Sequence, residues 1–297
     1  MTGQPRFELV VVVYKSRAAL EPFLAHLGRE TPVALVDNSI DEDDVTDLIA
    51  SYPLIRHVDA GGNLGYSAAS NLGARTSTAE FLIFINPDTR PTPDALERLV
   101  AFLEANPSVV CCGAPGVGTA GGGAQPTWGR VFVHAMGLHR RFPRAGLYFQ
   151  DLGGERVDVG WVAGSCLAVR RSTFARIGGF DPRYFIYQSD FDLGLRLQRD
   201  NRRQVLLGDV IMPHSDGGSS DLPSAWTWEK RGRAWTRFLR NTRPLPSAIG
   251  MTAILLTGNA TRAVFYGAKG ERVRAREVAT YARAGFMEWI RPEETPV

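Results

Sequence analysis

The feature that most constrains the fold of this chain is the alternation of short β-branched runs with helical patterns along its first part. Phe7 to Tyr14 (FELVVVVY) is a continuous apolar run, which predicts a strand buried on both faces, as in parallel sheets. Further strands are expected at 33–36, 55–58, 81–85 and 109–112, separated by helices at 18–27, 41–50, 67–74 and 94–104. Short links between such elements imply right-handed crossovers. The sequence therefore predicts an α/β fold in which a mostly parallel sheet carries helices on both faces.

The second half of the chain departs from this regular order. A glycine-rich stretch from Gly113 to Gly123 predicts a loop that continues to about Trp128. Strands are then expected at 157–162, 165–169 and 205–207, and helices at 172–177 and 189–200. Ser16 and Ser189 are the expected N-caps of the first helix and of the helix at 189–200. The pattern from residue 223 is helical and basic, so we expect one domain over 1–220 and a helical C-terminal segment over 221–297.

Composition narrows the class of protein. The chain has 297 residues, of which 44 % are hydrophobic, enough for a large core. Its three cysteines form no spaced framework, which indicates a reducing compartment. The N-terminus lacks a signal-peptide pattern, and no run approaches the ~20 apolar residues that span a bilayer. The longest candidate, AIGMTAILLTGNA, is interrupted by Gly258 and Asn259. We expect a cytoplasmic protein that is soluble or peripheral on a membrane.

Charge is spread unevenly along the chain. The net charge is +3, but the segment from Pro223 to the C-terminus holds 13 Lys and Arg against 6 Asp and Glu. It also holds four of the six tryptophans: Trp226, Trp228, Trp235 and Trp289. Two interpretations stay open. Either the segment binds an anionic surface, a membrane or a nucleic acid, or it is a solvated helical face whose tryptophans anchor a core.

Polar residues follow four successive predicted strands. They are Tyr14, Asp37 with Asn38, the GGNLGY motif at 61–66, and Asn86-Pro87-Asp88. Each of these alone is ordinary turn chemistry. In an open parallel sheet, however, the carboxyl ends of the strands border the crevice where ligands bind, so together these residues predict a ligand site. GGNLGY has neither the spacing nor the position of a dinucleotide fingerprint, which disfavours a dehydrogenase.

Two aspartates lie in the otherwise apolar segment YFIYQSDFDLGLRL at 184–197. On the predicted helix, Asp190 falls within the apolar stripe with Gly194. Asp192 lies about 160° away, beside its i+4 partner Arg196, and is interpreted as part of an exposed ion pair. Asp190 points inward, where a carboxylate must be paired, protonated or functional. Burial that raises its pKa would suit a general base.

His214 ends the last predicted strand, in MPHSDGGSS. A lone histidine is more often a hydrogen-bonded structural residue than a ligand. Beside the single carboxylate of Asp88 and a bound diphosphate, it would also suit a third ligand position on Mg²⁺ or Mn²⁺. Both interpretations stay open on the residues alone.

Taken together, these motifs resemble the family 2 inverting glycosyltransferases of the GT-A fold. The likeness rests on VVVYKS, VDN, GGNLGYSAASN, FINPDTRPT, VGWVAGSCLAVRR, FARIGGFDPRYFIYQSDFDLGLRL and MPH, which occur in the family's order between about Phe7 and Ser220. NPD followed by VGW and GSC is similar to bacterial rhamnosyltransferases that act on polyprenyl-diphosphate-linked N-acetylglucosamine. The resemblance implies a nucleotide-sugar-binding and catalytic domain over 1–220.

The resemblance also implies roles for individual residues. Three would contact the donor nucleotide: Tyr14, Asp37 and Asn63. Asn86 and Asp88 match the family's D-x-D metal motif, with Asn86 in place of its first Asp, and Asp88 with His214 would hold Mg²⁺ or Mn²⁺. Asp190 would be the catalytic base, preceded by Ser189 where the family carries Glu. The acceptor side would be lined by Gly164 and Ser165, with Trp161 behind them.

The implied reaction is inverting transfer of a sugar, foremost L-rhamnose from dTDP-rhamnose, to a hydroxyl of a lipid-linked or glycan acceptor. Asp190 would take the proton of that hydroxyl, and the metal would neutralise charge on the leaving diphosphate. Such an enzyme serves cell wall and polysaccharide biosynthesis. Its cationic, Trp-bearing segment over 221–297 would dock at the cytoplasmic face of the membrane that holds a polyprenyl-diphosphate acceptor.

Other functions stay open at this point. A family 2 transferase that uses a UDP- or GDP-sugar fits the same residues, since Asp37 can pair with uracil as well as thymine. A nucleotidyltransferase is disfavoured, because YKSRAAL after the first strand lacks a glycine-rich phosphate loop. Ser189 and Asn86 hint at a non-catalytic sugar-nucleotide-binding relic, which the retained acids oppose. Nucleic acid is not an expected partner, and the oligomeric state is left open.

Overall fold

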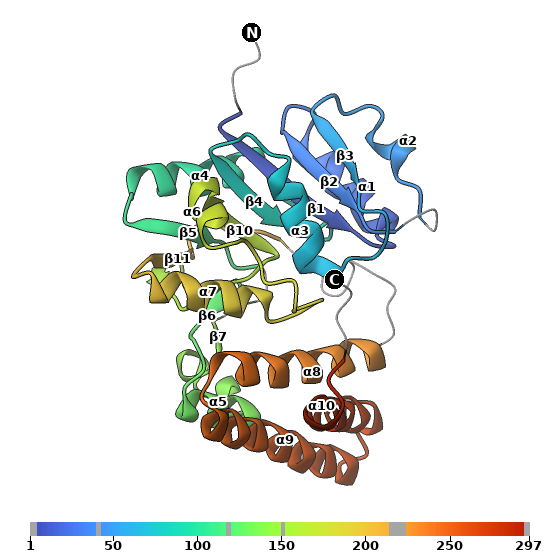
Figure 1. Ribbon diagram of the computed structural model, residues 1–297, viewed down its shortest axis with the longest axis vertical. Coiled ribbons are helices and arrows are strands. Elements are labelled where there is room, and N and C mark those ends of the chain that lie inside the picture. Colours follow the sequence, from blue (N-terminus) through green and yellow to red (C-terminus); the bar gives the residue numbers. More distant parts are fainter. Residues whose placement is uncertain (1–4, 40–42, 117–119, 150–151, 214–223, 294–297) are drawn as a thin grey trace.

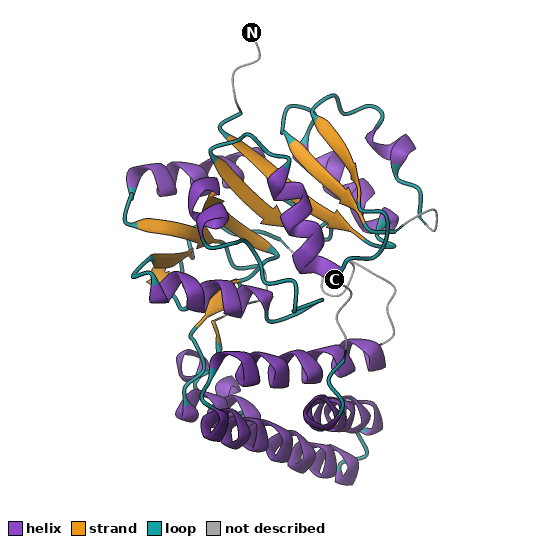
Figure 2. Cartoon of the chain, viewed as in Figure 1, coloured by secondary structure: helices purple, strands orange, loops and turns teal. Residues whose placement is uncertain are grey.

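The computed structural model describes residues 5–39, 43–116, 120–149, 152–213 and 224–293 (Figure 1). An α/β part that contains the sheet lies above a layer made of helices (Figure 2). The predicted boundary near residue 220 falls within 214–223, outside the described residues.

The main sheet has eight strands in the order β3-β2-β1-β4-β10-β5-β11-β8. Their bounds are β1 Phe7–Val13, β2 Val33–Asp37, β3 Ile55–Asp59, β4 Phe81–Ile85, β5 Val109–Gly113, β8 Arg156–Asp158, β10 Cys166–Arg170 and β11 Arg203–Leu207. The pairs β1–β2, β2–β3, β1–β4 and β5–β11 are parallel, which confirms the predicted mostly parallel sheet. β10 runs antiparallel between β4 and β5, and β8 runs antiparallel to β11 at one edge.

A second, small sheet lies below the first. It consists of β6 (Gly122–Gly123), β7 (Tyr148–Phe149) and β9 (Trp161–Val162) in the order β7-β6-β9. The single strand predicted at 157–162 is therefore wrong, because β8 joins the main sheet and β9 the small one. The loop expected over 113–128 also contains β6, whose residue Gly122 pairs with both Phe149 and Val162.

Helices cover both faces of the main sheet. Their bounds are α1 Arg17–Leu27, α2 Thr46–Ile49, α3 Gly65–Arg75, α4 Pro93–Ala105, α6 Arg171–Arg176 and α7 Ser189–Arg199. Alternate residues of β1 bury on opposite faces, because Leu9 and Val11 join the cluster that contains α1 and α4, whereas Val10 packs with α3. This double burial explains why β1 is apolar along its whole length.

Two predictions about helix starts need correction or qualification. Ser16 stands at the N-cap position of α1, but its hydroxyl bonds the backbone of Tyr14 and makes no side-chain cap to the helix. Ser189 is not an N-cap: it is the first residue of α7, and Gln188 occupies the cap position. The helix expected at 41–50 is confirmed only as the short α2, and residues 40–42 lie outside the described part.

The helical layer is formed by α8 (Ser224–Thr242), α9 (Leu245–Ala268) and α10 (Arg272–Ile290), with α5 (Trp128–Ala135) packed against α9. Two short 3₁₀ turns, Leu138–Arg140 and Pro143–Ala145, follow α5. A third core cluster joins this layer to α7, since Trp235 and Phe238 of α8 pack on Phe191. Trp235 is therefore a core anchor, and Trp228 and Trp289 pack beside it, half-buried.

Among the described residues, α9 is the one helix long and apolar enough to cross a membrane by length and composition. The sequence predicted no apolar run long enough to span a bilayer, because Gly258 and Asn259 interrupt the longest one, but α9 continues through both and passes that test. Gly258 allows close packing, since a Cβ there would lie 2.7 Å from Cβ of Ala135. The Asn259 amide donates to the carbonyl of Leu255 inside the helix (2.8 Å). Length and composition alone do not distinguish a membrane-spanning helix from one packed on a soluble protein. The contacts of α9 with the rest of the chain are needed to decide between the two.

Candidate active site

A pocket of about 590 Å³ opens beyond the carboxyl ends of the parallel strands. Its walls include Tyr14 and Asn38, which follow β1 and β2, and Asn63 and Asn86, which follow β3 and β4. This is the crevice that the topology of an open parallel sheet predicts. Polar residues that are far apart in the sequence therefore share one site.

The pocket brings together most of the residues that the sequence singled out. Seven of them line it: Tyr14, Asn63, Asn86, Trp161, Gly164, Ser165 and Asp190. The antiparallel insertion of β10 explains why the expected donor and acceptor sides meet, because it places the start of β10 beside the end of β4. The backbone N–H of Asn86 donates to the carbonyl of Ser165 (3.3 Å).

Two of the expected donor residues lie outside the pocket lining. Asp37 accepts from the backbone N–H of Ser39 (2.8 Å) and lies 3.3 Å from Nε2 of His57, and its neighbour Asn38 faces the pocket instead. Asp88 is 1 % exposed at the end of β4. Their roles toward a nucleotide or a metal stay predictions. His214 lies outside the described residues.

Asp190 occupies the first turn of α7 with its carboxylate at the pocket wall. Oδ1 accepts from the backbone N–H of Phe191 (2.9 Å), and Oδ2 accepts from that of Gly164 (3.4 Å). Within the described part of the chain, no Lys, Arg or His forms an ion pair with it. Burial raises the pKa of Asp190 to about 6, and the backbone hydrogen bonds oppose the rise. A half-buried carboxylate with that pKa is ionised at neutral pH yet basic enough to accept a proton.

A sharp turn before α7 aims Asp190 at the pocket. Tyr187 (φ 64°) and Gln188 (φ 60°) both adopt the left-handed region, which non-glycine residues occupy rarely. Such backbone strain is typical of functional sites, where the surrounding structure holds it in place. The turn therefore sets the direction in which α7 begins.

Packing behind Asp190 fixes the helix that carries it. The ring of Phe191 stacks on Trp161 with 3.9 Å between centroids, and Nε1 of Trp161 donates to the carbonyl of Leu147 (3.2 Å). Gly194 allows this approach, since a Cβ there would lie 2.8 Å from Cα of Trp161. Trp161 therefore both lines the pocket and packs against the helix that carries Asp190; its role on the acceptor side stays a prediction.

The GGNLGY motif forms a second wall of the pocket. Gly65 (φ 75°) lies against Phe185, where a Cβ would come within 2.5 Å of the Phe185 carbonyl oxygen, and the N–H of Tyr66 donates to that oxygen (2.7 Å). The hydroxyl of Tyr66 donates to the carbonyl of Gly164 (2.8 Å). The glycine motif thus joins the segment before α7 to the expected acceptor side.

Asp192 corrects one prediction. It does form the expected ion pair with Nε of Arg196 (2.7 Å), but it is 5 % exposed rather than on an open helix face. The loop after α6 covers it, because Arg196 also donates to the carbonyl of Ile177 (2.7 Å). Burial raises its pKa, while Arg196 opposes that change.

Comparison with known proteins now identifies the family. Residues 8–178, more than half of the chain, match the sequence model of the family described as Glycosyl transferase family 2. The chain belongs to glycosyl transferase family 2. It is therefore a glycosyltransferase, and the resemblance seen in its motifs is confirmed.

Individual relatives agree with this family. The N-acetylglucosaminyl-diphospho-decaprenol L-rhamnosyltransferase of Mycobacterium tuberculosis is 33 % identical over 236 residues, which are 71 % of this transferase and 76 % of the relative. The rhamnosyltransferase WbbL of Escherichia coli is 28 % identical over 153 residues, 46 % of this transferase and 56 % of the relative. A solved mannosyltransferase from Pyrobaculum calidifontis, in complex with GDP-Man and Mn²⁺, has a TM-score of 0.60 at 18 % identity and covers 97 % of this chain and 88 % of its own. That likeness confirms the fold.

The fit of a divalent metal to this family 2 transferase is limited by its carboxylates. Among the described residues there is no group of three His, Cys, Asp or Glu side chains that could hold a metal ion. Asp88 and the Asn86 amide provide one carboxylate and one neutral oxygen at the end of β4. Mg²⁺ is often bound by one or two carboxylates together with substrate phosphates and waters. The residues therefore suit a metal that the donor diphosphate helps to hold, and not a preformed protein cage.

Several pocket residues of the transferase were missed by the sequence analysis. They are Tyr66, Tyr148, Tyr187, Trp226 and Arg231. Tyr66 lay within a quoted motif, which was the available signal. Arg231 comes from α8, and its guanidinium lies over the rings of Tyr187 (5.1 Å) and Trp228 (5.5 Å). No sequence pattern connects residue 231 with strands that lie more than a hundred residues before it.

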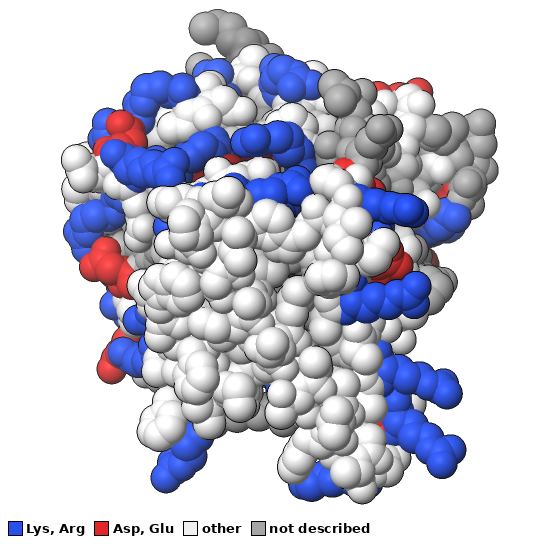
Figure 3. Space-filling view, turned by 60° about the horizontal axis from the view of Figure 1, so that its bottom comes forward, with Lys and Arg blue, Asp and Glu red and all other residues white. Residues whose placement is uncertain are grey.

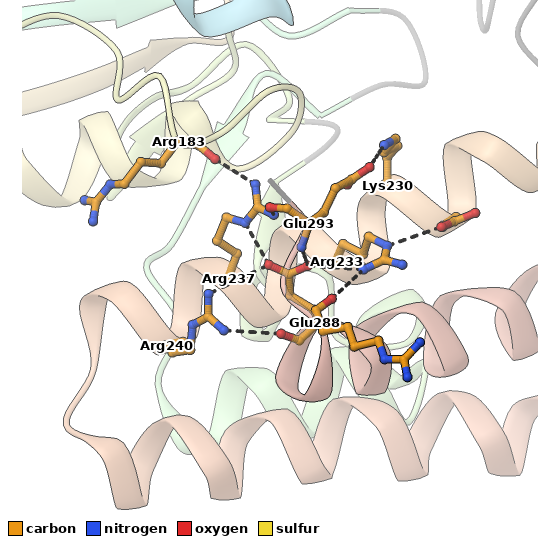
Figure 4. Close-up of polar contacts among 9 residues, drawn as sticks. Arg183, Lys230, Arg233, Arg237, Arg240, Glu288 and Glu293 are labelled. Atoms are coloured by element: carbon orange, nitrogen blue, oxygen red, sulfur yellow. Dashed lines mark hydrogen bonds and ion pairs between the residues drawn. The ribbon is translucent and has the colours of Figure 1, made fainter. Parts of the chain in front are cut away.

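A buried ion network ties the helical layer of the transferase to the segment before α7 (Figure 4). Arg237 of α8 donates from Nε to Glu288 of α10 (2.8 Å) and from Nη1 to the carbonyl of Arg183 (2.9 Å). Arg233 (3.4 Å) and Arg240 (3.9 Å) also reach the Glu288 carboxylate. The helices after residue 224 therefore help to hold the segment that leads to Asp190.

Proposed function

We propose that this transferase moves L-rhamnose from dTDP-rhamnose to a hydroxyl of a polyprenyl-diphosphate-linked N-acetylglucosamine. The observation that carries the proposal is Asp190, a carboxylate without an ion-pair partner among the described residues, set in the wall of the pocket. The name of the Mycobacterium tuberculosis relative supports the sugar and the acceptor. The cytoplasmic face of a membrane follows as the place of reaction, because such an acceptor is membrane-bound.

The chain's own residues account for the central step. Asp190 accepts the proton of the acceptor hydroxyl, which attacks the anomeric carbon on the side opposite the nucleoside diphosphate, so that configuration is inverted. Tyr14 and Asn63 hold the nucleotide at the ends of β1 and β3. Gly164 and Ser165 line the acceptor side, next to the base. A single base suffices, which agrees with the presence of Asp190 and not Asp192 in the pocket lining.

Charge on the two diphosphates needs cations. Asp88, with Asn86 and His214, would hold Mg²⁺ or Mn²⁺, which when bound neutralises charge that develops on the leaving diphosphate. Arg231 lies on the α8 side of the pocket, where its guanidinium suits the diphosphate of the acceptor. The Mn²⁺ in the Pyrobaculum calidifontis structure supports a divalent ion in this fold.

The test is a transfer assay with dTDP-rhamnose, UDP-N-acetylglucosamine and GDP-mannose as donors and a short polyprenyl-diphosphate-N-acetylglucosamine as acceptor. Transfer from dTDP-rhamnose alone is expected, stimulated by Mn²⁺. Transfer from the UDP- or GDP-sugar would keep the mechanism and overturn the sugar. That second candidate is favoured by the GDP-Man bound to the mannosyltransferase of the same fold.

Calorimetry measures the affinity for dTDP, UDP and GDP separately from the rate of sugar transfer. Binding of dTDP that strengthens with Mn²⁺ is expected, and Asp88→Asn should remove the effect of Mn²⁺ while leaving metal-free binding in place. Nucleotide binding without transfer from any donor would favour the non-catalytic relic, and failure of all three nucleotides to bind would overturn the proposal.

A further inference from the structure

The helical layer has one outer face that is unlike the others. α9 is apolar along its length, yet only 33 % of its most apolar stretch is buried. Between Arg243 and Lys269, Arg262 is the one charged residue in the sequence. A helix packed on one side of a soluble protein normally carries charges on the other. α10 in the same layer does so, with exposed Arg272, Arg276 and Arg283.

The exposed side of α9 is an uncharged and mainly apolar stripe, in which the exposed Thr257 bonds its hydroxyl to the backbone carbonyl of Ala253. Leu245, Ile249 (52 % exposed) and Val264 (74 % exposed) lie on it, and Ala253 and Ala260 are exposed between them. Successive positions lie four or seven residues apart and therefore share one side of the helix. The opposite side is buried in the third core cluster through Ala248, Met251 and Leu255.

α5 extends this stripe sideways. Trp128 (48 % exposed), Phe132 and Met136 are exposed at spacings of four residues, and thus lie on one side of α5 and its C-cap. The two helices are in close contact, because a Cβ on Gly250 would overlap the Trp128 ring. We call the surface formed by Trp128, Phe132, Met136, Leu245, Ile249 and Val264 the α5–α9 face.

The two segments that form the α5–α9 face carry charge of one sign. Neither 128–149 nor 244–270 contains an Asp or Glu. Lys269 lies 4.5 Å from the ring centroid of the exposed Phe265, and Arg141 lies 5.9 Å from that of the exposed Phe142. Figure 3 shows a broad uncharged surface with many Lys and Arg, and fewer Asp and Glu, along its edges. Apolar and aromatic side chains bordered by cations are the composition of surfaces that lie in the headgroup region of anionic membranes.

We propose that the α5–α9 face docks onto an anionic lipid surface, with α9 lying in the plane of the membrane. A second copy of this chain fits less well, since a self-complementary interface would bring cations against cations. A spanning α9 would strip Met251 and Leu255 from the core that they share with Trp235 and Phe191. In this proposal the segment over 221–297 contributes to the docking surface, as the sequence predicted, but through α9 and not through its tryptophans.

This inference rests on the proposed function for its meaning. α8 lies between α7 and α9 (Figure 1) and gives Trp226 and Arg231 to the pocket. Docking through the α5–α9 face therefore holds the pocket near the membrane that contains a lipid-linked acceptor. The docking itself requires neither donor nor acceptor and is tested separately.

The experiment is flotation of the full chain with vesicles of phosphatidylcholine, with and without phosphatidylglycerol. We expect binding that needs phosphatidylglycerol and weakens with salt, because screening acts on the cations at the edge. The double variant Phe132→Glu with Val264→Glu should bind at least about tenfold more weakly. The matched control is Leu54→Glu, an exposed apolar residue on the α/β part, which should bind like the wild type.

Other results would overturn the proposal. The first is equal vesicle binding by the double variant and the wild type. The second is resistance of the bound protein to extraction by alkaline carbonate, which would mean that α9 spans the membrane. The third is a chain that binds no vesicles but forms a dimer, which Val264→Glu dissociates. Thermal melting and dTDP calorimetry of each variant show that the fold and pocket are intact. Vesicle binding without rhamnosyl transfer would contradict the proposed function and support the docking face. Transfer to a lipid-linked acceptor without vesicle binding would contradict the docking face and support the proposed function.

Discussion

Two acids in this transferase, the half-buried Asp190 and the fully buried Glu288, show how the same chemical group becomes reactive in one place and structural in another. Glu288 is 0 % exposed, and its carboxylate lies within 4 Å of Arg233, Arg237 and Arg240 (Figure 4). Asp190 receives two backbone N–H groups and no ion pair from the described residues. Burial without a countercharge raises the pKa of Asp190.

The comparison explains where the chain keeps a base. The Glu288 carboxylate is held by three arginines and does not line the pocket. A carboxylate at an apolar wall holds a proton more readily, at some cost to stability. The helical layer therefore contributes rigidity through Glu288, and the end of the sheet contributes chemistry through Asp190.

The largest effect on stability is expected at Glu288. Glu288→Gln leaves three guanidinium groups without their shared countercharge, which should lower the free energy of unfolding by about 3 kcal/mol or more. Chemical denaturation measures it. The control is Glu229→Gln, which removes an acid that pairs with Arg233 from a half-exposed position and should cost less than about 1 kcal/mol. Equal effects at the two sites would show that Glu288 is not the centre of the network.

Asp190→Asn should change stability in the opposite direction. Because the folded-state pKa of Asp190 is raised to about 6, its contribution is full below its ordinary pKa and is lost as pH rises through 6. At neutral pH the amide should therefore increase the free energy of unfolding, by about 2 kcal/mol once the partial exposure is considered. The gain should vanish near pH 4. A loss of stability at neutral pH would mean that Asp190 has a partner that holds it ionised.

The reaction rate should follow the ionisation of Asp190. Below its pKa of about 6 the base is protonated, so kcat should fall about tenfold for each unit of decreasing pH and level off above pH 7. Steady-state rates across pH measure it. Glu288→Gln should keep the same midpoint, since its carboxylate is not part of the pocket. A rate that is flat down to pH 5 would exclude a base with this pKa.

The smallest effect is expected at Asp192. Asp192→Asn keeps a hydrogen-bond acceptor for Arg196, whose side chain is one-quarter exposed, so about 1 kcal/mol of stability should be lost. Transfer should remain within a few-fold of wild type, because Asp192 does not line the pocket. Thermal melting and initial rates report the two quantities. Loss of transfer without loss of stability would show that the second aspartate is functional as well.

Much of the fold could be predicted from local patterns. β1 is apolar throughout because both of its faces are buried, and the polar residues after β1, β3 and β4 reach one pocket because parallel strands end at the same edge. The direction of β10 could not be predicted, since an apolar run has the same pattern whichever way it crosses the sheet. That reversal is what places Ser165 beside Asn86.

The positions of site residues could be predicted where they depend on the periodicity of a single helix. They were missed where they depend on how distant segments of the chain pack together. Helical periodicity placed Asp190 away from the solvent-facing side of α7, and its carboxylate lies half-buried in the pocket wall. It placed Asp192 on an open face, because the spacing within α7 carries no information about the loop near Ile177 that covers it. Arg231 was missed for the same reason, since its place in the pocket depends on how α8 packs against α7.

The most direct test of the central claim is the rate of rhamnosyl transfer by Asp190→Asn, measured beside its affinity for dTDP. An amide cannot take the proton of the acceptor hydroxyl, so we expect transfer to fall by about a thousandfold while dTDP binds within a few-fold of wild type. Affinity that falls in parallel with the rate, or transfer that survives, would contradict the assignment of Asp190 as the base.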